Sequence, residues 1–153
     1  MTAIAESPLD LIAGRPPDLL AISVVLIGGE ADMLRVRSTM RACAQQAGLG
    51  LTATTKVVTA GSELARNILR YASGGQGEAR IEEATSGLKR GVRAVFTDHG
   101  PGIADLDLAM RSGFSTAGSL GVGLPGSRRL VDEFTIDSVP GQGTRVAICQ
   151  WGR

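Results

Sequence analysis

The sequence predicts a two-layer α/β sandwich in which helices cover one face of a mixed β-sheet. The prediction rests on the order of the expected elements, strand-helix-helix-strand-strand-loop-helix-strand-strand, because sheets and amphipathic helices bury their apolar faces against each other. The chain has 153 residues, of which 43% are hydrophobic, enough for one domain with a single core. It shows no internal repeat and no change in composition that would separate two domains.

The first half of the chain contains one expected strand and two expected helices. Residues Leu20–Ile27 form a continuous, β-branched apolar run, which is typical of a strand. Apolar residues then recur at helical spacing over Ala31–Ala47 and again over Thr52–Tyr71, and Gly48 separates the two helices. Gly61 lies inside the second helix and is expected to weaken it by roughly 1 kcal/mol relative to alanine.

The second half is richer in strands. Glu78–Thr85 and Gly91–Thr97 are expected to form a hairpin joined by the loop Ser86–Arg90. A short helical piece is expected at Asp105–Arg111 and a flexible loop at Gly113–Gly121. A helix with a proline in its first turn follows at Leu124–Phe134. The last two strands are expected at Thr135–Val139 and Thr144–Trp151. Residues 1–18 contain several prolines and are expected to be a flexible arm, which leaves 19–153 as the folded domain.

Composition and charge exclude several classes of protein. The 16 basic and 15 acidic side chains give a net charge of +1, so no strong positive field for nucleic acid is expected. No apolar run approaches the ~20 residues that span a membrane, and the first residues do not resemble a signal peptide. Cys43 and Cys149 lack metal-binding spacing and are expected to be reduced core residues, and His99 is expected to be an exposed turn residue. A cytoplasmic protein without nucleic-acid or membrane partners is therefore expected.

The first of three motifs lies on the second helix. Glu63 and Asn67 are four residues apart and share a helix face. A carboxylate can take a proton from an attacking hydroxyl group, and an amide oxygen is a ligand suited to Mg²⁺. On spacing alone, two polar residues on a solvated face are the more common explanation of such a pair.

The second motif is Asp98-His-Gly-Pro-Gly102-Ile, directly after an apolar strand. The Asp98 carboxylate can accept a hydrogen bond from an exocyclic amino group, and Gly100 and Gly102 would let a flat ring lie close to the backbone. The alternative is an ordinary turn, since Asp, Gly and Pro are common turn residues.

The third motif is a glycine-rich loop, Gly118–Leu124, at the start of the third helix. Backbone N–H groups at a helix start attract phosphate. The loop lacks the lysine of a Walker A motif, and no strand precedes it as in a dinucleotide-binding fingerprint. A glycine-rich linker is the alternative.

Taken together and in this order, the three motifs resemble the Bergerat ATP-binding fold of gyrase, Hsp90, histidine kinases and MutL. The pair Gly143-Thr144 stands where that pattern ends. Four stretches look like the RsbT-type serine/threonine kinases, the switch kinases of the bacterial stressosome: Ser62–Ala72, Asp98–Ile103, Gly113–Phe134 and Gly141–Thr144. The resemblance covers nearly all of the chain after the N-terminal arm.

The resemblance implies an ATP site with Mg²⁺. Asp98 would hold the adenine amino group with support from Thr144, Asn67 would bind Mg²⁺, and Glu63 would be the catalytic base. The adenine wall would be formed by Gly100, Gly102 and Ile103. The triphosphate would be lined by Gly118, Gly121, Gly123 and Leu124. Ser115 and Thr116 in a mobile lid would contact a phosphate, and Arg111 or Arg128 would either add positive charge or remain solvated.

The resemblance also implies protein partners. Family members phosphorylate a serine or threonine of a STAS-domain scaffold protein and then activate a PP2C-type phosphatase. The first helix, with Arg35, Arg37 and Arg41, is either the surface that binds such a partner or a solvated charged face. Two other functions remain open: a non-catalytic anti-sigma factor that uses ATP as a conformational ligand, and a nucleotide-sensing fragment of a histidine kinase, against which the absence of a phosphoacceptor domain argues.

Overall fold

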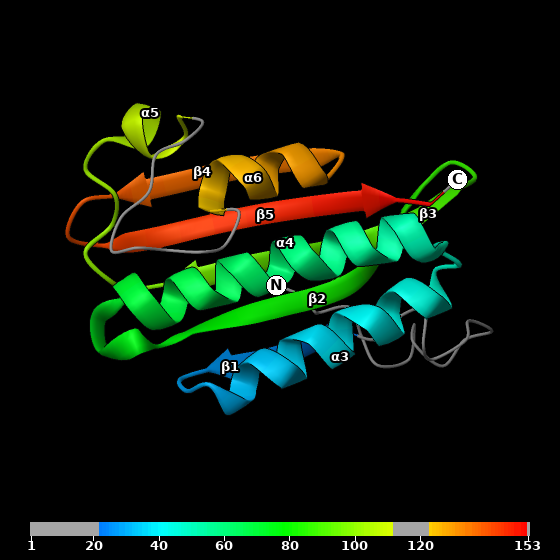
Figure 1. The fold of residues 1–153 in the computed structure, drawn as a ribbon, viewed down its shortest axis with the longest axis horizontal. Helices are drawn as coiled ribbons and strands as arrows, with labels where there is room; N and C mark the ends of the chain where they lie inside the picture. Colours follow the sequence, from blue (N-terminus) through cyan, green and yellow to red (C-terminus); the bar gives the residue numbers. More distant parts are fainter. Residues whose placement is uncertain (1–21, 112–122, 153) are drawn as a thin grey trace, which may run out of the picture.

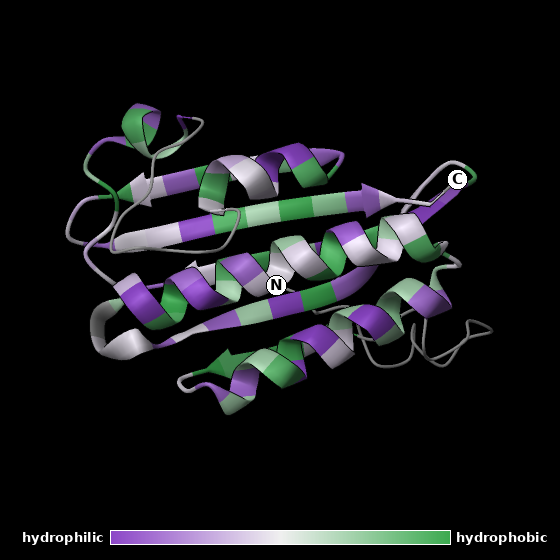
Figure 2. Cartoon of the chain, viewed as in Figure 1, coloured by the Kyte–Doolittle hydropathy of each residue, from purple (hydrophilic) through white to green (hydrophobic). Residues whose placement is uncertain are grey.

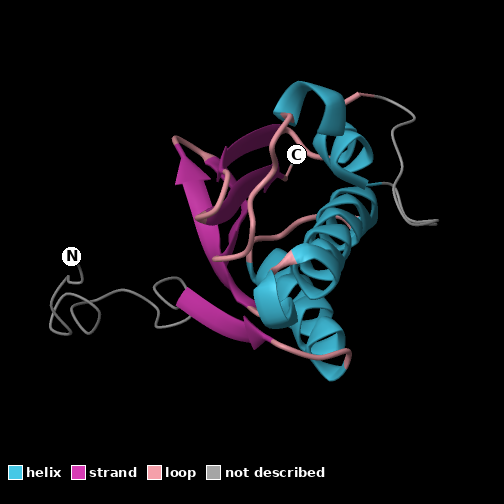
Figure 3. Ribbon diagram, turned by 90° about the vertical axis from the view of Figure 1, so that its left-hand side faces the viewer, coloured by secondary structure: helices cyan, strands magenta, loops and turns pink. Residues whose placement is uncertain are grey.

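The computed structural model describes residues 22–111 and 123–152, and it contains one five-stranded sheet in the order β1-β2-β3-β5-β4. Helices lie on one side of this sheet (Figure 3). The strands are β1 (Ile22–Ile27), β2 (Gly77–Ser86), β3 (Lys89–Asp98), β4 (Glu133–Val139) and β5 (Gly143–Trp151). The helices are α3 (Ala31–Gln46), α4 (Leu51–Tyr71), α5 (Leu106–Ala109) and α6 (Gly123–Leu130), with a 3₁₀ turn, η1 (Ser73–Gly75), after α4.

The two-layer sandwich is confirmed, but the expected mixed sheet is wrong. Every pairing between the described strands is antiparallel. Short turns join β2 to β3 and β4 to β5, and such turns impose antiparallel pairing. The remaining partner of β5 is β3, so β5 lies between β3 and β4 and runs opposite to both. Side-chain alternation carries no information about strand direction, which is why the sequence did not reveal it.

Several element boundaries also differ from expectation: the short helix α5 is Leu106–Ala109 rather than Asp105–Arg111, and β4 begins at Glu133 rather than Thr135. The third helix ends at Leu130 rather than Phe134, because the Asp132 carboxylate accepts hydrogen bonds from Trp151 N and Gln150 Nε2 of β5 and fixes the chain at the start of β4. The β2–β3 hairpin is tighter than expected, with Ser86 paired directly to Lys89. The predictions for residues 1–18 and for Gly113–Gly121 lie outside the described residues.

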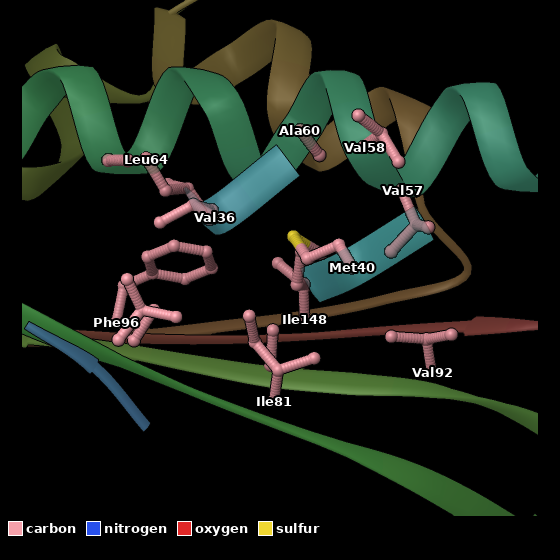
Figure 4. Close-up of a cluster of buried hydrophobic side chains, with 14 of the residues drawn as sticks. Val36, Met40, Val57, Val58, Ala60, Leu64, Ile81, Val92, Phe96 and Ile148 are labelled. Atoms are coloured by element: carbon pink, nitrogen blue, oxygen red, sulfur yellow. The ribbon is translucent and has the colours of Figure 1, made fainter. Parts of the chain in front are cut away.

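The core lies between the sheet and helices α3 and α4. Apolar and polar residues alternate around both helices (Figure 2), and the apolar ones meet the inner face of the central strands. Figure 4 shows Met40 of α3 above Ile81 and Ile148 of the sheet. A Cβ atom at Gly61 would lie closer than 3.0 Å to the Met40 side chain. Gly61, expected only to weaken its helix, therefore allows α3 and α4 to approach each other.

Candidate functional site

Three polar residues form a row across the end of three adjacent strands. Asp98 of β3 pairs with Thr144 of β5, and Thr144 pairs with Ser138 of β4. Side chains of directly paired residues lie on the same face of a sheet. Asp98 follows the buried Phe96 by two residues, so the row faces the helical layer. All three residues of the row are partly buried.

Hydrogen bonds hold this row in place. The Asp98 Oδ1 atom accepts from Gly100 N at 2.8 Å. The Ser138 hydroxyl lies 2.8 Å from the Thr144 hydroxyl and accepts from Ile103 N at 2.7 Å. Ser138 thus connects two residues that the resemblance assigned to the adenine site. The sequence analysis missed Ser138, because only its register opposite Thr144 gives it this position.

The loop that carries Asp98 packs backbone to backbone against the β4–β5 turn. Gly141 N donates to Pro101 O at 2.7 Å. Gly102 has φ +75° and Gly143 has φ +136°, and a Cβ atom at either would lie closer than 3.0 Å to a backbone atom of the other loop. The two glycines are therefore required by this loop contact. Asp98 and Thr144 are fixed relative to each other as a result.

Glu63 and Asn67 lie one turn apart on α4. Glu63 is 5% exposed, which excludes the solvated-face alternative for this residue, and Asn67 is partly buried. The Glu63 Oε1 atom pairs with Arg66 Nη1 at 2.6 Å. Its Oε2 atom lies 3.4 Å from Gly123 N, at the start of α6. The first motif and the end of the glycine-rich loop therefore meet in the structure.

The end of α4 that carries Asn67 packs on Gly77 of β2, the neighbour of Asp98 at one end of the row. A Cβ atom at Gly77 would lie 2.9 Å from Ile68, the residue after Asn67, and Gly77 pairs with Asp98. Figure 1 shows the C-terminal end of α4 and the start of β5 at the same end of the molecule, and α6 begins further toward its middle. Glu63, Asn67 and the row thus belong to one region.

The other expected site residues fall into three groups: residues outside the described ranges, a residue packed against the core, and exposed or hydrogen-bonded arginines. Ser115, Thr116, Gly118 and Gly121 lie outside the described residues. Leu124 is partly buried and packs against the core. Arg111 and Arg128 are exposed, as are Arg35 and Arg41 of α3, whereas Arg37 donates from Nε to Ser62 Oγ at 2.9 Å.

The cysteines and the histidine behave as expected. His99 is exposed, Cys149 is buried, Cys43 is partly buried, and both thiols are free. Burial is the main cause that raises the pKa of each thiol to about 11. Among the described residues, no group of three or more His, Cys, Asp or Glu side chains is placed to hold a metal. None of the described helices is long and apolar enough to cross a membrane.

Comparison with solved structures supports the same fold. The RsbU and RsbW domains of a Mycobacterium tuberculosis protein superpose with a TM-score of 0.60 at 20% identity, over 85% of this chain and 32% of that one. The mycobacterial sensor histidine kinase MprB superposes with a TM-score of 0.52 at 17% identity, over 87% of this chain and 99% of that one. At these identities the likeness concerns the fold alone.

Comparison of sequences is more specific. Residues 52–151 match the family described as histidine kinase-, DNA gyrase B- and HSP90-like ATPases. The serine/threonine-protein kinase RsbT of Bacillus subtilis is 44% identical over 131 residues, which cover 86% of this chain and 97% of the relative. The chain therefore belongs to the histidine kinase-, gyrase- and HSP90-like ATPase family and, within it, to the RsbT-type serine/threonine kinases.

Proposed function

We propose that this protein is a protein serine/threonine kinase that transfers the γ-phosphoryl group of ATP to a STAS-domain protein and so acts as a partner switch. The observation that carries the proposal is the position of Glu63. Its carboxylate is buried, it lies one turn from Asn67, and it reaches the first N–H group of α6. The similarity to a named serine/threonine kinase over most of the chain supports the same activity.

The adenine half of the proposed site is built on the sheet. Asp98 accepts from the exocyclic amino group of adenine, and the neighbouring Thr144 hydroxyl supports that contact. Ser138 holds Thr144 and the amide of Ile103 together. Guanine has a carbonyl oxygen where adenine has its amino group, so the Asp98 carboxylate disfavours it. Loss of a hydrogen bond to a charged group costs ~1.5–3 kcal/mol, or ~10–100-fold in affinity.

The phosphate half of the proposed site lies between α4 and α6. Mg²⁺ usually binds one or two protein oxygens together with substrate phosphates and waters, rather than a cage of protein ligands. The single amide oxygen of Asn67 and the absence of an acidic cluster among the described residues fit this mode. Bound there, Mg²⁺ would neutralise charge on the phosphates. The first N–H groups of α6, beginning with Gly123, would face the phosphates as well.

In the proposed reaction, the substrate hydroxyl oxygen attacks the γ-phosphorus, the hydroxyl proton passes to the Glu63 carboxylate, and ADP leaves. Phosphoryl transfer depends mainly on positioning and charge neutralisation, so few protein groups are needed. The Glu63 Oε2 atom contacts Gly123 N at 3.4 Å in this structure, a long hydrogen bond that a substrate hydroxyl can replace.

The proposed partners are proteins. A PP2C-type phosphatase is the proposed target after release from the STAS-domain substrate, in line with partner switching. The exposed Arg35 and Arg41 on α3 offer a basic face for an acidic partner surface. The free thiols of Cys43 and Cys149 fit a cytoplasmic location, where thiols remain reduced.

The decisive experiment incubates the protein with radiolabelled ATP, Mg²⁺ and purified STAS-domain proteins of the same organism, and maps the labelled residue. Glu63→Gln should bind ADP normally and transfer phosphate ~10²–10⁴-fold more slowly, the usual loss for a general base. Glu30→Gln makes the same change at an exposed carboxylate and should transfer normally. A Glu63→Gln protein with an unchanged rate would remove Glu63 from the reaction.

Two further variants separate the halves of the site. Asp98→Ala should lose ADP affinity and the preference for ADP over GDP. Asn67→Ala should lose the Mg²⁺ dependence of nucleotide binding while it remains folded, because Asn67 is only partly buried. Nucleotide binding without any labelled protein would favour the anti-sigma factor alternative.

A further inference from the structure

Within residues 22–111 and 123–152, the buried Glu63 carboxylate contacts one charged group and one uncharged group. Arg66 Nη1 lies 2.6 Å from Oε1, and the backbone N–H of Gly123 lies 3.4 Å from Oε2. The Glu63 side chain is 6% exposed and that of Arg66 is 32% exposed. The partly exposed Arg66 side chain therefore pairs with a carboxylate that is itself almost entirely shielded from solvent.

We propose that Arg66 is a positioning residue that fixes the Glu63 carboxylate with Oε2 directed at the start of α6. The proposal rests on the proposed role of Glu63 as base. A charged contact of 2.6 Å is short and strong, whereas a contact of 3.4 Å to an amide is weak. The Arg66 contact to Oε1 thus decides the orientation of the carboxylate. The other oxygen, Oε2, is left to the weak partner and faces Gly123 at the start of α6.

Arg37, on the α3 side of this turn of α4, has other partners. Its Nε donates to Ser62 Oγ, and the same hydroxyl donates to Val58 O at 2.8 Å. On the α6 side, the Gly123 amide that contacts Glu63 carries no charge.

The consequence of losing Arg66 follows from burial. A carboxylate that loses its partner in a buried position becomes unfavourable there and turns toward water. The attacking hydroxyl then lacks a base at the required position, while Asp98 and Thr144 on the sheet remain in place. Because a single nitrogen of Arg66, Nη1, pairs with Glu63, the single ammonium group of a lysine can replace it.

The test is a double-mutant cycle in the radiolabel transfer assay. Arg66→Ala should lower the transfer rate ~10–100-fold, as expected for a displaced reacting group, and leave the dissociation constant of ADP unchanged. Arg66→Lys should restore most of the rate. Arg70→Ala removes an exposed arginine one turn further along α4 and should transfer normally. Arg66→Gln, which is similar in size, serves if Arg66→Ala does not fold.

The double variant Glu63→Gln/Arg66→Ala distinguishes positioning from direct contact with substrate. If Arg66 acts through Glu63, the double variant is as slow as Glu63→Gln alone. If the double variant instead loses rate by the product of the two single losses, the proposal is overturned, because Arg66 then acts on the phosphates or the partner protein. An unchanged rate in Arg66→Ala, with Glu63→Gln slow, would also overturn it and leave the proposed base intact. Normal transfer by Glu63→Gln would instead refute the proposed function.

Discussion

Gly143 and Gly141 stand two residues apart in the turn before Thr144, and substitution of each by alanine should have different consequences. Both have positive φ, +136° and +82°, so alanine introduces backbone strain of ~1–2 kcal/mol at either position. A Cβ atom at Gly141 meets nothing within 4 Å, whereas one at Gly143 overlaps the Asp98 carbonyl oxygen. Backbone overlap of this kind adds ~1–3 kcal/mol at Gly143 alone.

The overlap at Gly143 also affects the site, because Asp98 must move to relieve it. Gly143→Ala should melt ~2–12 °C below Gly141→Ala, since 1 kcal/mol shifts the melting temperature of a protein of this size by ~2–4 °C. Its ADP affinity should fall ~10–100-fold, the loss of one charged hydrogen bond, while Gly141→Ala binds ADP normally. Scanning fluorimetry and calorimetry measure both effects. Equal melting temperatures and equal ADP affinities of the two variants would refute the loop contact as the reason for Gly143.

Three further outcomes are expected. Ser138→Ala should weaken ADP binding and lower the stability by ~1–3 kcal/mol in urea unfolding, because the Ile103 amide loses its partner. Gly61→Ala should destabilise the protein by up to ~2 kcal/mol, because overlap with the buried Met40 costs ~1–3 kcal/mol and the gain in helix propensity offsets ~1 kcal/mol of it; a rise in stability would contradict the close contact. The pKa of the Cys43 and Cys149 thiols is raised from 9.0 to about 11, so stability should fall as the pH rises from 9 to 11, and less so in the variant without cysteines.

Much of the fold could be predicted from periodicity alone. The helices Ala31–Gln46 and Leu51–Tyr71 lie within one residue of their predicted ends, because each carries a long apolar stripe. The end of α6 was wrong, because the hydrogen bonds of Asp132 to β5 come from a strand that is distant in sequence. Gly61 looked like a weak point in its helix, and only the position of Met40 across the helix interface explains it.

The candidate site could be predicted where a motif has fixed spacing. Glu63 and Asp98 were candidates because each belongs to a short pattern of characteristic residues, and their functional roles remain proposals. Ser138 and Arg66 were missed for a different reason. A serine in a strand and an arginine on a helix are common, and their importance depends on partners that the fold supplies.

The two halves of the site are held by different kinds of structure, and this bears on how the kinase works. The Asp98–Thr144–Ser138 row is fixed by strand register and by a loop contact that allows no side chain at Gly143. Glu63 instead depends on a side-chain ion pair and on a long contact to the start of α6. Side-chain contacts of this kind rearrange more readily than a strand register. Nucleotide binding should therefore survive changes at Arg66 that slow transfer, so that occupancy of the site and phosphorylation of the partner can be controlled separately.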